Sequence, residues 1–271
     1  MRNTSLTLST VLFSLLLAAG CRETEAGAPV EEANTHEVVQ GNTAFAVDLY
    51  QQLRGQGGNI FFSPHSISLA LGMTYGGARR ITAEEMAAAL HFPKNHEQLH
   101  PDFERLNRKL AQTAEGTGQK LNIANGLCLT GGDVSPEYKN LLANSYDAEF
   151  FRGGVDKINA WVSTKTEGKI ERILDQLTAN SVCVLLNAIY FKGLWESPFK
   201  EEQTHDAPFF VKPEEEVTVR LMHQRCPFKV LRKEGFQAAS IPYKGKRMSM
   251  VILLPDAVDG LPAFEKELSA G

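Results

Sequence analysis

One stretch of the chain has the residue types and spacing of a metal-dependent hydrolase. His96, Glu97 and His100 form the pattern His-Glu-x-x-His. On a helix, this spacing places two imidazoles on one face, where they can bind Zn²⁺, and the glutamate can act as a general base. A zinc metallopeptidase is therefore one hypothesis for this chain.

Two prolines argue against a helix running through that motif. Pro93 lies three residues before His96, and Pro101 directly follows His100. A proline inside a helix removes one backbone hydrogen bond and crowds the preceding turn. We therefore expect a loop around His96, a helix that starts at Pro101, and neither a bound metal nor another cofactor. The apolar face of that helix would consist of Phe103, Leu106 and Leu110.

Other sequence features exclude further classes of function. The chain contains no Gly-x-Ser-x-Gly elbow, so nothing in it predicts a serine hydrolase. Its net charge of -4 lacks the basic excess that nucleic-acid binding needs. Residues 102–109 contain both acidic side chains (Asp102, Glu104) and basic ones (Arg105, Arg108, Lys109), and this mixture of charges is typical of a solvated helix face. We expect no nucleic acid as a partner and no heparin-type site.

The first residues have the layout of an export signal. An apolar run, too short to span a membrane comfortably, ends in Ala18-Ala19-Gly20-Cys21. Small residues directly before a cysteine are typical of a lipoprotein signal, so we predict removal of residues 1–20 and lipidation of the Cys21 thiol. The protein would then be anchored to a membrane at a bacterial cell surface or in the periplasm. An ordinary secretory signal that contains a cysteine is the alternative.

Helical spacing of apolar residues appears early in the rest of the chain. After a polar stretch, 21–35, which predicts a flexible tether, helices are expected over 38–53, from Pro64 to the Gly76-Gly77 pair, and over 82–90 and 155–166. Ser63 before Pro64 is typical of a helix N-cap. Thr82 with Glu85 matches a capping box.

Strand-like runs dominate later. They cover 59–62, 121–127, 182–191 and 248–254. The run 182–191 is nearly all apolar, as expected of a strand that is covered on both faces. Asn187 lies inside it, and a buried amide is costly unless it is hydrogen bonded. Helices first and strands later favour the α+β class over a wound parallel sheet.

Five blocks of the sequence, in order, resemble the serpin family. They are residues 42–50 (NTAFAVDLY), 59–86 (opening NIFFSPHSIS), 158–170 (opening INAWV), 186–199 (opening LNAIYFKGLW) and 242–255 (closing MVILLP). The resemblance implies the serpin fold, with N-terminal helices on a large central sheet and smaller sheets beside it. It also implies an inhibitor of serine or cysteine proteases rather than an enzyme.

The resemblance carries a mechanism with it. Inhibitory serpins present an exposed loop to a protease as bait. After cleavage, the loop inserts into the central sheet as an additional strand and carries the acylated protease along. The sheet must therefore be able to part in the middle.

The resemblance also assigns site residues. Ser63, Ser66 and Asn187 match the shutter, where the central strands separate, and short hydroxyl and amide groups can exchange hydrogen-bond partners there. Trp195 matches the breach, where the loop first enters. The alternative is purely structural, with Ser63 as a helix cap, Asn187 as a buried amide and Trp195 as a core residue.

The predicted organisation is a signal peptide at 1–20, the tether at 21–35 and a partial serpin domain at 36–271. The family continues beyond the point that matches Gly271, so we expect a C-terminally truncated chain in which the reactive bond is not present. A non-inhibitory or inactive truncated serpin relative, acting by binding, is the alternative function.

Overall fold

The structure, a computed structural model, describes residues 35–56, 58–93 and 96–270. Cys21, the predicted signal peptide 1–20 and nearly all of the predicted tether 21–35 lie outside the described residues. Within the described part of the chain, no helix combines the length and the apolar character needed to cross a membrane.

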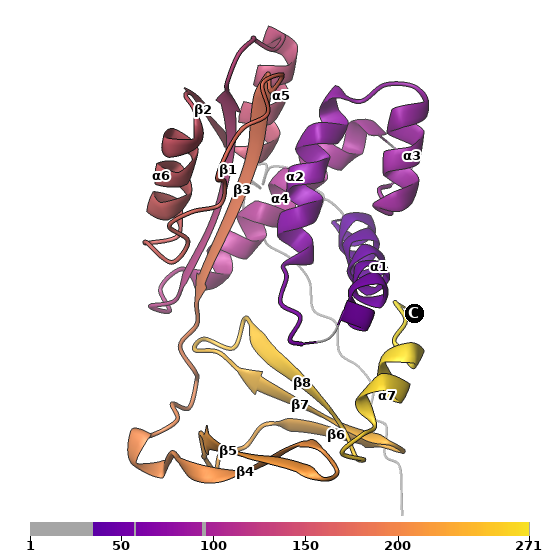
Figure 1. Cartoon of the computed structure of the whole chain (residues 1–271), viewed down its shortest axis with the longest axis vertical. Coiled ribbons are helices and arrows are strands. Elements are labelled where there is room, and N and C mark those ends of the chain that lie inside the picture. Colours follow the sequence, from indigo (N-terminus) through magenta and orange to yellow (C-terminus); the bar gives the residue numbers. More distant parts are fainter. Residues whose placement is uncertain (1–34, 57, 94–95, 271) are drawn as a thin grey trace, which may run out of the picture. The chain divides into compact units, whose positions relative to one another are not determined.

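Most helices of the described residues lie before residue 166 (Figure 1). They are α1 (His36–Leu53), α2 (Pro64–Gly77), α3 (Ile81–Ala89), α4 (His96–Ala114), α5 (Pro136–Tyr146) and α6 (Val155–Lys165), with the short 3-10 helix η1 (Arg54–Gln56) after α1. A second 3-10 helix, η2 (Glu201–Gln203), and α7 (Leu261–Glu267) follow later.

The strands of the described residues form three sheets. The mixed sheet has the order β2-β1-β3 and consists of β1 (Lys120–Leu129), β2 (Ala148–Arg152) and β3 (Cys183–Lys192). A hairpin joins β4 (His205–Lys212) to β5 (Glu215–Leu221), and the third sheet contains β6 (Lys229–Lys233), β7 (Phe236–Pro242) and β8 (Ser249–Pro255). Helices followed by mostly antiparallel sheets confirm the α+β class.

Pairing within the mixed sheet is uneven. β1 and β3 are antiparallel along their whole length, from Lys120 opposite Lys192 to Leu129 opposite Cys183. β2 is parallel to β1 but pairs only with Asn125–Leu129. The first half of β1 therefore has a strand on one side only among the described residues.

Helices cover both faces of the mixed sheet. Leu127 of β1 packs in a cluster with buried side chains of α2, α4 and α5, including Phe103 and Leu142. On the opposite face, Cys128 packs with Ile158 of α6 and Leu186 of β3. Burying an aliphatic or aromatic side chain contributes roughly 1.5–3 kcal/mol, so these two clusters stabilise the sheet. The prediction that the strand at 182–191 is covered on both faces is confirmed for its first half.

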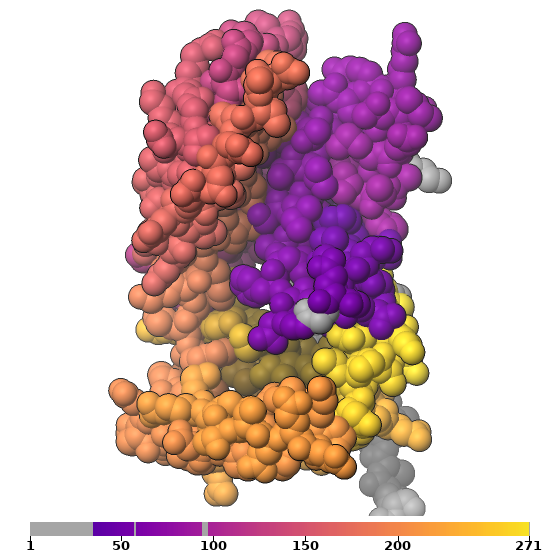
Figure 2. All heavy atoms as spheres, in the orientation of Figure 1, coloured from indigo at the N-terminus to yellow at the C-terminus, as the bar shows by residue number. Residues whose placement is uncertain are grey.

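The first and last helices of this part contact each other (Figures 1 and 2). The Tyr50 hydroxyl of α1 donates a hydrogen bond to the Glu265 carboxylate of α7. Gln51 Nε2 donates to the Glu265 carbonyl oxygen at 2.6 Å. Only 8% of Glu265 is exposed, and these bonds fasten α7 to α1.

Three sequence predictions are wrong in detail. α4 begins at His96 and contains Pro101, so the expected loop at His96 is a helical turn. Leu99 and Phe103 lie on either side of that proline and are almost completely buried. Their burial outweighs the loss of the single backbone bond, from Pro101 to the first turn of the helix.

The other two errors concern a strand and a cap. Residues 59–62 form no strand, and Phe61 is fully exposed, because no strand of the described residues lies beside them to pair with their backbone. α3 begins at Ile81 after Arg80, which has a φ of 53° and provides no side-chain cap. Thr82 is therefore inside the helix, and the predicted capping box does not form.

Candidate functional site

Hydrogen-bonded side chains cross the middle of the mixed sheet. Ser66 Oγ on α2 donates to Asn187 Oδ1 on β3. Asn187 Nδ2 donates to Asn125 Oδ1 on β1 at 2.8 Å, and Asn125 Nδ2 donates to the carbonyl oxygen of Tyr146 at 2.7 Å. We call Ser66, Asn187, Asn125 and the Tyr146 carbonyl the shutter chain. It joins α2, two strands and the end of α5 through side-chain amides.

Local structure explains why these groups meet. Ser63 precedes Pro64 at the start of α2, and its Oγ accepts a hydrogen bond from the Ser66 backbone at 3.2 Å, as predicted for an N-cap. This cap fixes the first turn of α2 and so aims Ser66 at the sheet. Asn125 and Asn187 are directly opposite each other in the β1–β3 register, so their side chains share one face.

The shutter chain lies in a buried environment. Asn125 is 3% exposed, and Asn187 and Ser66 are half-buried. A buried amide without partners would cost about 1–3 kcal/mol. Both asparagines avoid this cost, since each donates and accepts within the shutter chain.

Two histidines lie close to the shutter chain. Burial lowers the pKa of His65, whose Nε2 donates to Asn107 Oδ1 at 2.8 Å and so links α2 to α4. His100 Nδ1 is hydrogen bonded to the Tyr146 hydroxyl at 2.7 Å. Burial also raises the pKa of Tyr146, which keeps that hydroxyl protonated. These two contacts join α2 to α4 and α4 to the end of α5.

The predicted site residues do not all come together. Ser66 and Asn187 are bonded, and Ser63 is adjacent to them through the cap. Trp195 lies beyond the other end of β3, where its ring stacks on Tyr243 with centroids 4.7 Å apart. Trp195 and Tyr243 also form an isolated β-bridge, and Gly193 contacts the Tyr243 ring so closely that a Cβ there would lie 2.5 Å from it.

The structure places the His-Glu-x-x-His motif, the candidate zinc site, within one helix. That helix is α4, where Glu97 is exposed and His100 binds the Tyr146 hydroxyl. Among the described residues, no group of three histidine, cysteine or acidic side chains is placed to hold a metal ion. The prolines were thus the wrong reason for setting the motif aside, because the helix does form. The contact of His100 with Tyr146 gives that histidine a structural role.

Asn125 and Tyr146 belong to the shutter chain but were not predicted. Asn125 stands in the largely apolar stretch from Leu121 to Leu129, in the same way that Asn187 stands in 182–191. Asn122 stands in the same stretch, so the available signal was an amide within an apolar run and did not single out Asn125. Tyr146 contributes its backbone carbonyl, which no side-chain pattern can indicate.

A family model described as "Serpin (serine protease inhibitor)" matches residues 40–271. Ipis-1 of Ixodes persulcatus is 41% identical over 243 residues, which cover 83% of this chain and 63% of the relative. The leukocyte elastase inhibitor of Bos taurus is 40% identical over 247 residues, covering 84% of this chain and 64% of the relative. The chain thus spans a little under two thirds of the length of these relatives.

Solved structures show the same similarity. Cleaved kallistatin complexed with heparin has a TM-score of 0.81 at 26% identity, with 87% of this chain and 73% of that chain covered. Ovalbumin from emu (Dromaius novaehollandiae) has a TM-score of 0.79 at 28% identity, with 86% and 67% covered.

Proposed function

Since the chain belongs to the serpin family, we propose that it forms the sheet-opening part of an inhibitor of serine or cysteine proteases. The relative from Bos taurus is named as an elastase inhibitor rather than as an enzyme. Serpin inhibition requires the central sheet to accept a cleaved loop as a new strand. Two features of the described residues support this role, the unpaired outer edge of β3 and the hydrogen-bonded side chains beside it.

The observation that carries the proposal is the shutter chain at the middle of β3. β3 pairs with β1 on one side, and no strand of the described residues pairs with its other edge. A strand arriving at that edge would lie next to Asn187, whose side chain bonds Ser66 and Asn125. Amide and hydroxyl groups can change partners at low cost, because each is both donor and acceptor.

The bait loop is the finer part of the proposal. We propose that inhibition needs a reactive loop outside residues 36–271, consistent with relatives of which this chain covers 63–64%. Solved relatives include cleaved serpins, such as reaction loop cleaved lamprey angiotensinogen. The residues described here would supply the site of insertion rather than the bond that the protease attacks.

The test compares two forms of the protein with trypsin-, chymotrypsin- and elastase-like proteases. The 271-residue chain is expected to give no SDS-stable complex. The same chain joined to whatever the gene encodes after codon 271 is expected to give one, and Asn187→Ala in that form should shift products from complex towards cleaved inhibitor. A covalent complex with the 271-residue chain alone would refute the placement of the loop. Cleavage by every protease without any complex would favour a non-inhibitory relative.

We also propose that the protein is a lipoprotein held at a bacterial membrane through Cys21, facing the periplasm or the cell exterior. The support is the sequence Ala18-Ala19-Gly20-Cys21, which follows a short apolar run. The expressed protein should partition with membranes and incorporate labelled palmitate. Cys21→Ser should abolish the label, and labelling that survives this substitution would overturn the anchor.

A further inference from the structure

The first half of β1 has an open edge inside a cavity. β2 begins at Ala148, which pairs with Asn125, so Lys120–Ala124 has β3 on one side and no strand of the described residues on the other. Unpaired backbone groups at a strand edge can pair with another extended chain. This edge is on the opposite side of the mixed sheet from the outer edge of β3.

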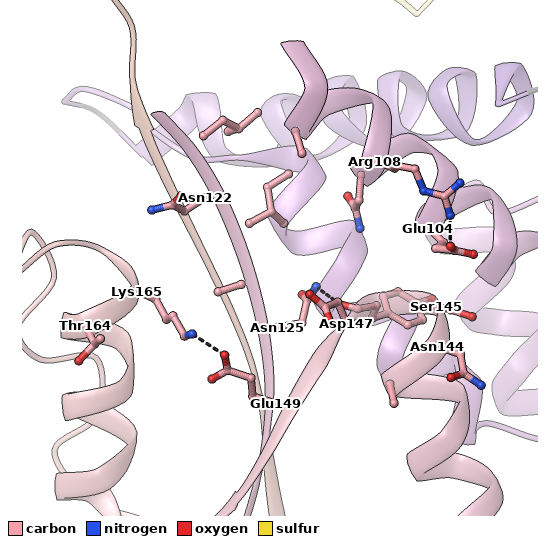
Figure 3. Close-up of a pocket in the computed structure, with 17 residues that line it drawn as sticks. Glu104, Arg108, Asn122, Asn125, Asn144, Ser145, Asp147, Glu149, Thr164 and Lys165 are labelled. Atoms are coloured by element: carbon pink, nitrogen blue, oxygen red, sulfur yellow. Dashed lines mark hydrogen bonds and ion pairs between the residues drawn. The ribbon is translucent and has the colours of Figure 1, made fainter. Parts of the chain in front are cut away.

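The cavity has a volume of about 800 Å³ and is lined by the four residues Leu121–Ala124 of the open edge and by the adjacent Asn125. Residues of α4 and the last turn of α5 line one side of it, and Thr164 and Lys165 of α6 line the other. In Figure 3, Asn125 and Asn122 point from the strand in different directions, Asn125 towards Asp147 and Asn122 towards α6. The strand edge is thus exposed between two walls, and the volume is typical of ligand sites.

The charges around the cavity do not balance. Glu104 is paired with Arg108, and Glu149 is paired with Lys165 (Figure 3). The third carboxylate of the lining, Asp147, takes part in none of the ion pairs of the described residues. It caps α5 with a left-handed backbone, φ 50°, at the point where the chain turns into β2. An occupant with one positive charge would complement this lining.

We propose that the cavity binds a basic peptide segment in an extended conformation, which pairs with the open edge of β1. The open edge has the length of about four residues, so a segment of that size fits it. Main-chain hydrogen bonds would provide most of the affinity, as in other cases of strand addition. A lysine or arginine of the peptide would lie near Asp147. This site lies at the edge of the mixed sheet opposite to the edge of β3 where loop insertion is proposed.

The probe is the capped tetrapeptide acetyl-Thr-Lys-Val-Thr-amide, titrated into the 271-residue chain. Two control peptides have the same length. In one, alternate backbone nitrogens are methylated, and in the other the lysine is replaced by norleucine. Binding is measured by calorimetry, and amide hydrogen exchange locates it. We expect slower exchange within Leu121–Ala124, and at least a tenfold loss of affinity for the methylated peptide.

Variants separate the charge from the strand edge. Asn suits the left-handed backbone at position 147, so Asp147→Asn should leave the fold intact. It should weaken the binding of the lysine peptide about two- to five-fold, as expected for an exposed ion pair, and should not change the binding of the norleucine peptide. Asp259→Asn, an exposed aspartate outside the cavity lining, is the matched control and should change nothing. Ala143 is an exposed residue of α5 that lines the cavity, so the larger side chain of Ala143→Leu should occupy part of the cavity and weaken the binding of every peptide.

Several results would overturn the proposal. They are no binding by any peptide, equal binding of the methylated peptide, or protection from exchange outside Leu121–Ala124. Unchanged binding by Ala143→Leu would have the same consequence. Because none of these measurements involves a protease, their failure would leave the proposed inhibitor function standing, and the reverse also holds.

Discussion

Replacing Asn125 by alanine should reveal how strongly the shutter chain stabilises the protein. The substitution removes one bond accepted from Asn187 and one donated to the Tyr146 carbonyl. Each hydrogen bond contributes about 0.5–1.5 kcal/mol, and leaving its buried partners unsatisfied adds to the loss. We expect unfolding to become easier by about 2–4 kcal/mol, a large share of the roughly 5–15 kcal/mol of a typical domain.

The assay is urea unfolding followed by far-ultraviolet circular dichroism and tryptophan fluorescence. Trp161 is a suitable reporter, because its ring contacts Gly126, next to the substituted residue. With a slope of about 1–3 kcal/mol per molar urea, the midpoint should fall by about 1 M or more. Asn122→Ala is the matched control, an exposed asparagine on the same strand, and should change the free energy of unfolding by about 0.5 kcal/mol or less.

The comparison is decisive, since both substitutions make the same chemical change in one strand. If Asn125→Ala and Asn122→Ala destabilise the protein equally, the shutter chain adds no stability and our reasoning is wrong. A double-mutant cycle that combines Asn125→Ala with Asn187→Ala is a second test. If the two amides interact as described, it should show a coupling of about 0.5–1.5 kcal/mol. Additive effects would contradict the bond between them.

Three further predictions follow from other contacts. Burial lowers the pKa of His65 in the folded protein, so as the pH falls this histidine is protonated in the unfolded chain first. The free energy of unfolding should therefore be highest above about pH 6.5 and decrease below it. In urea titrations at pH 5 and 7.5, His65→Gln should reduce the difference between the two pH values. Tyr50→Phe removes a bond to the buried Glu265 carboxylate and should cost about 1.5–3 kcal/mol in thermal unfolding; an unchanged melting temperature would contradict a stabilising contact between α1 and α7. Apolar side chains at 250–254 of β8 are all exposed, so the 271-residue chain should enhance the fluorescence of a hydrophobic dye, and dye emission equal to that of buffer would show that this surface is covered.

Local patterns predicted much of the fold correctly. Helical spacing of apolar residues located α1, α2 and α6, and strand-like apolar runs located β1, β3 and β8. The cap at Ser63 was also predicted, since it depends on neighbouring residues only. Residues 59–62 failed for the converse reason. Their apolar, β-prone composition is local, whereas a strand exists only when a second strand pairs with it.

The site was less accessible to sequence reasoning. The resemblance to serpins indicated Ser66 and Asn187, but not that Asn125 joins them. Asn125 and Asn187 are 62 residues apart, and their contact depends on the register between β1 and β3. No local pattern encodes that register. The bond from Asn125 to the Tyr146 carbonyl also requires α5 to end at Tyr146, and helix ends are predicted less accurately than helix interiors.

Asn125 is in contact with both neighbours of β1 in the mixed sheet. Its side chain bonds Asn187 on β3, whereas its backbone stands opposite Ala148, where β2 begins and the open edge of β1 ends. A strand inserted beside β3 that drew Asn187 away would leave Asn125 Oδ1 without the donor that it now has. Because Asn125 also lines the cavity, a replacement donor would be found among groups on the cavity side. Insertion at one edge would therefore change the hydrogen bonding available at the other, through a single cross-strand amide pair.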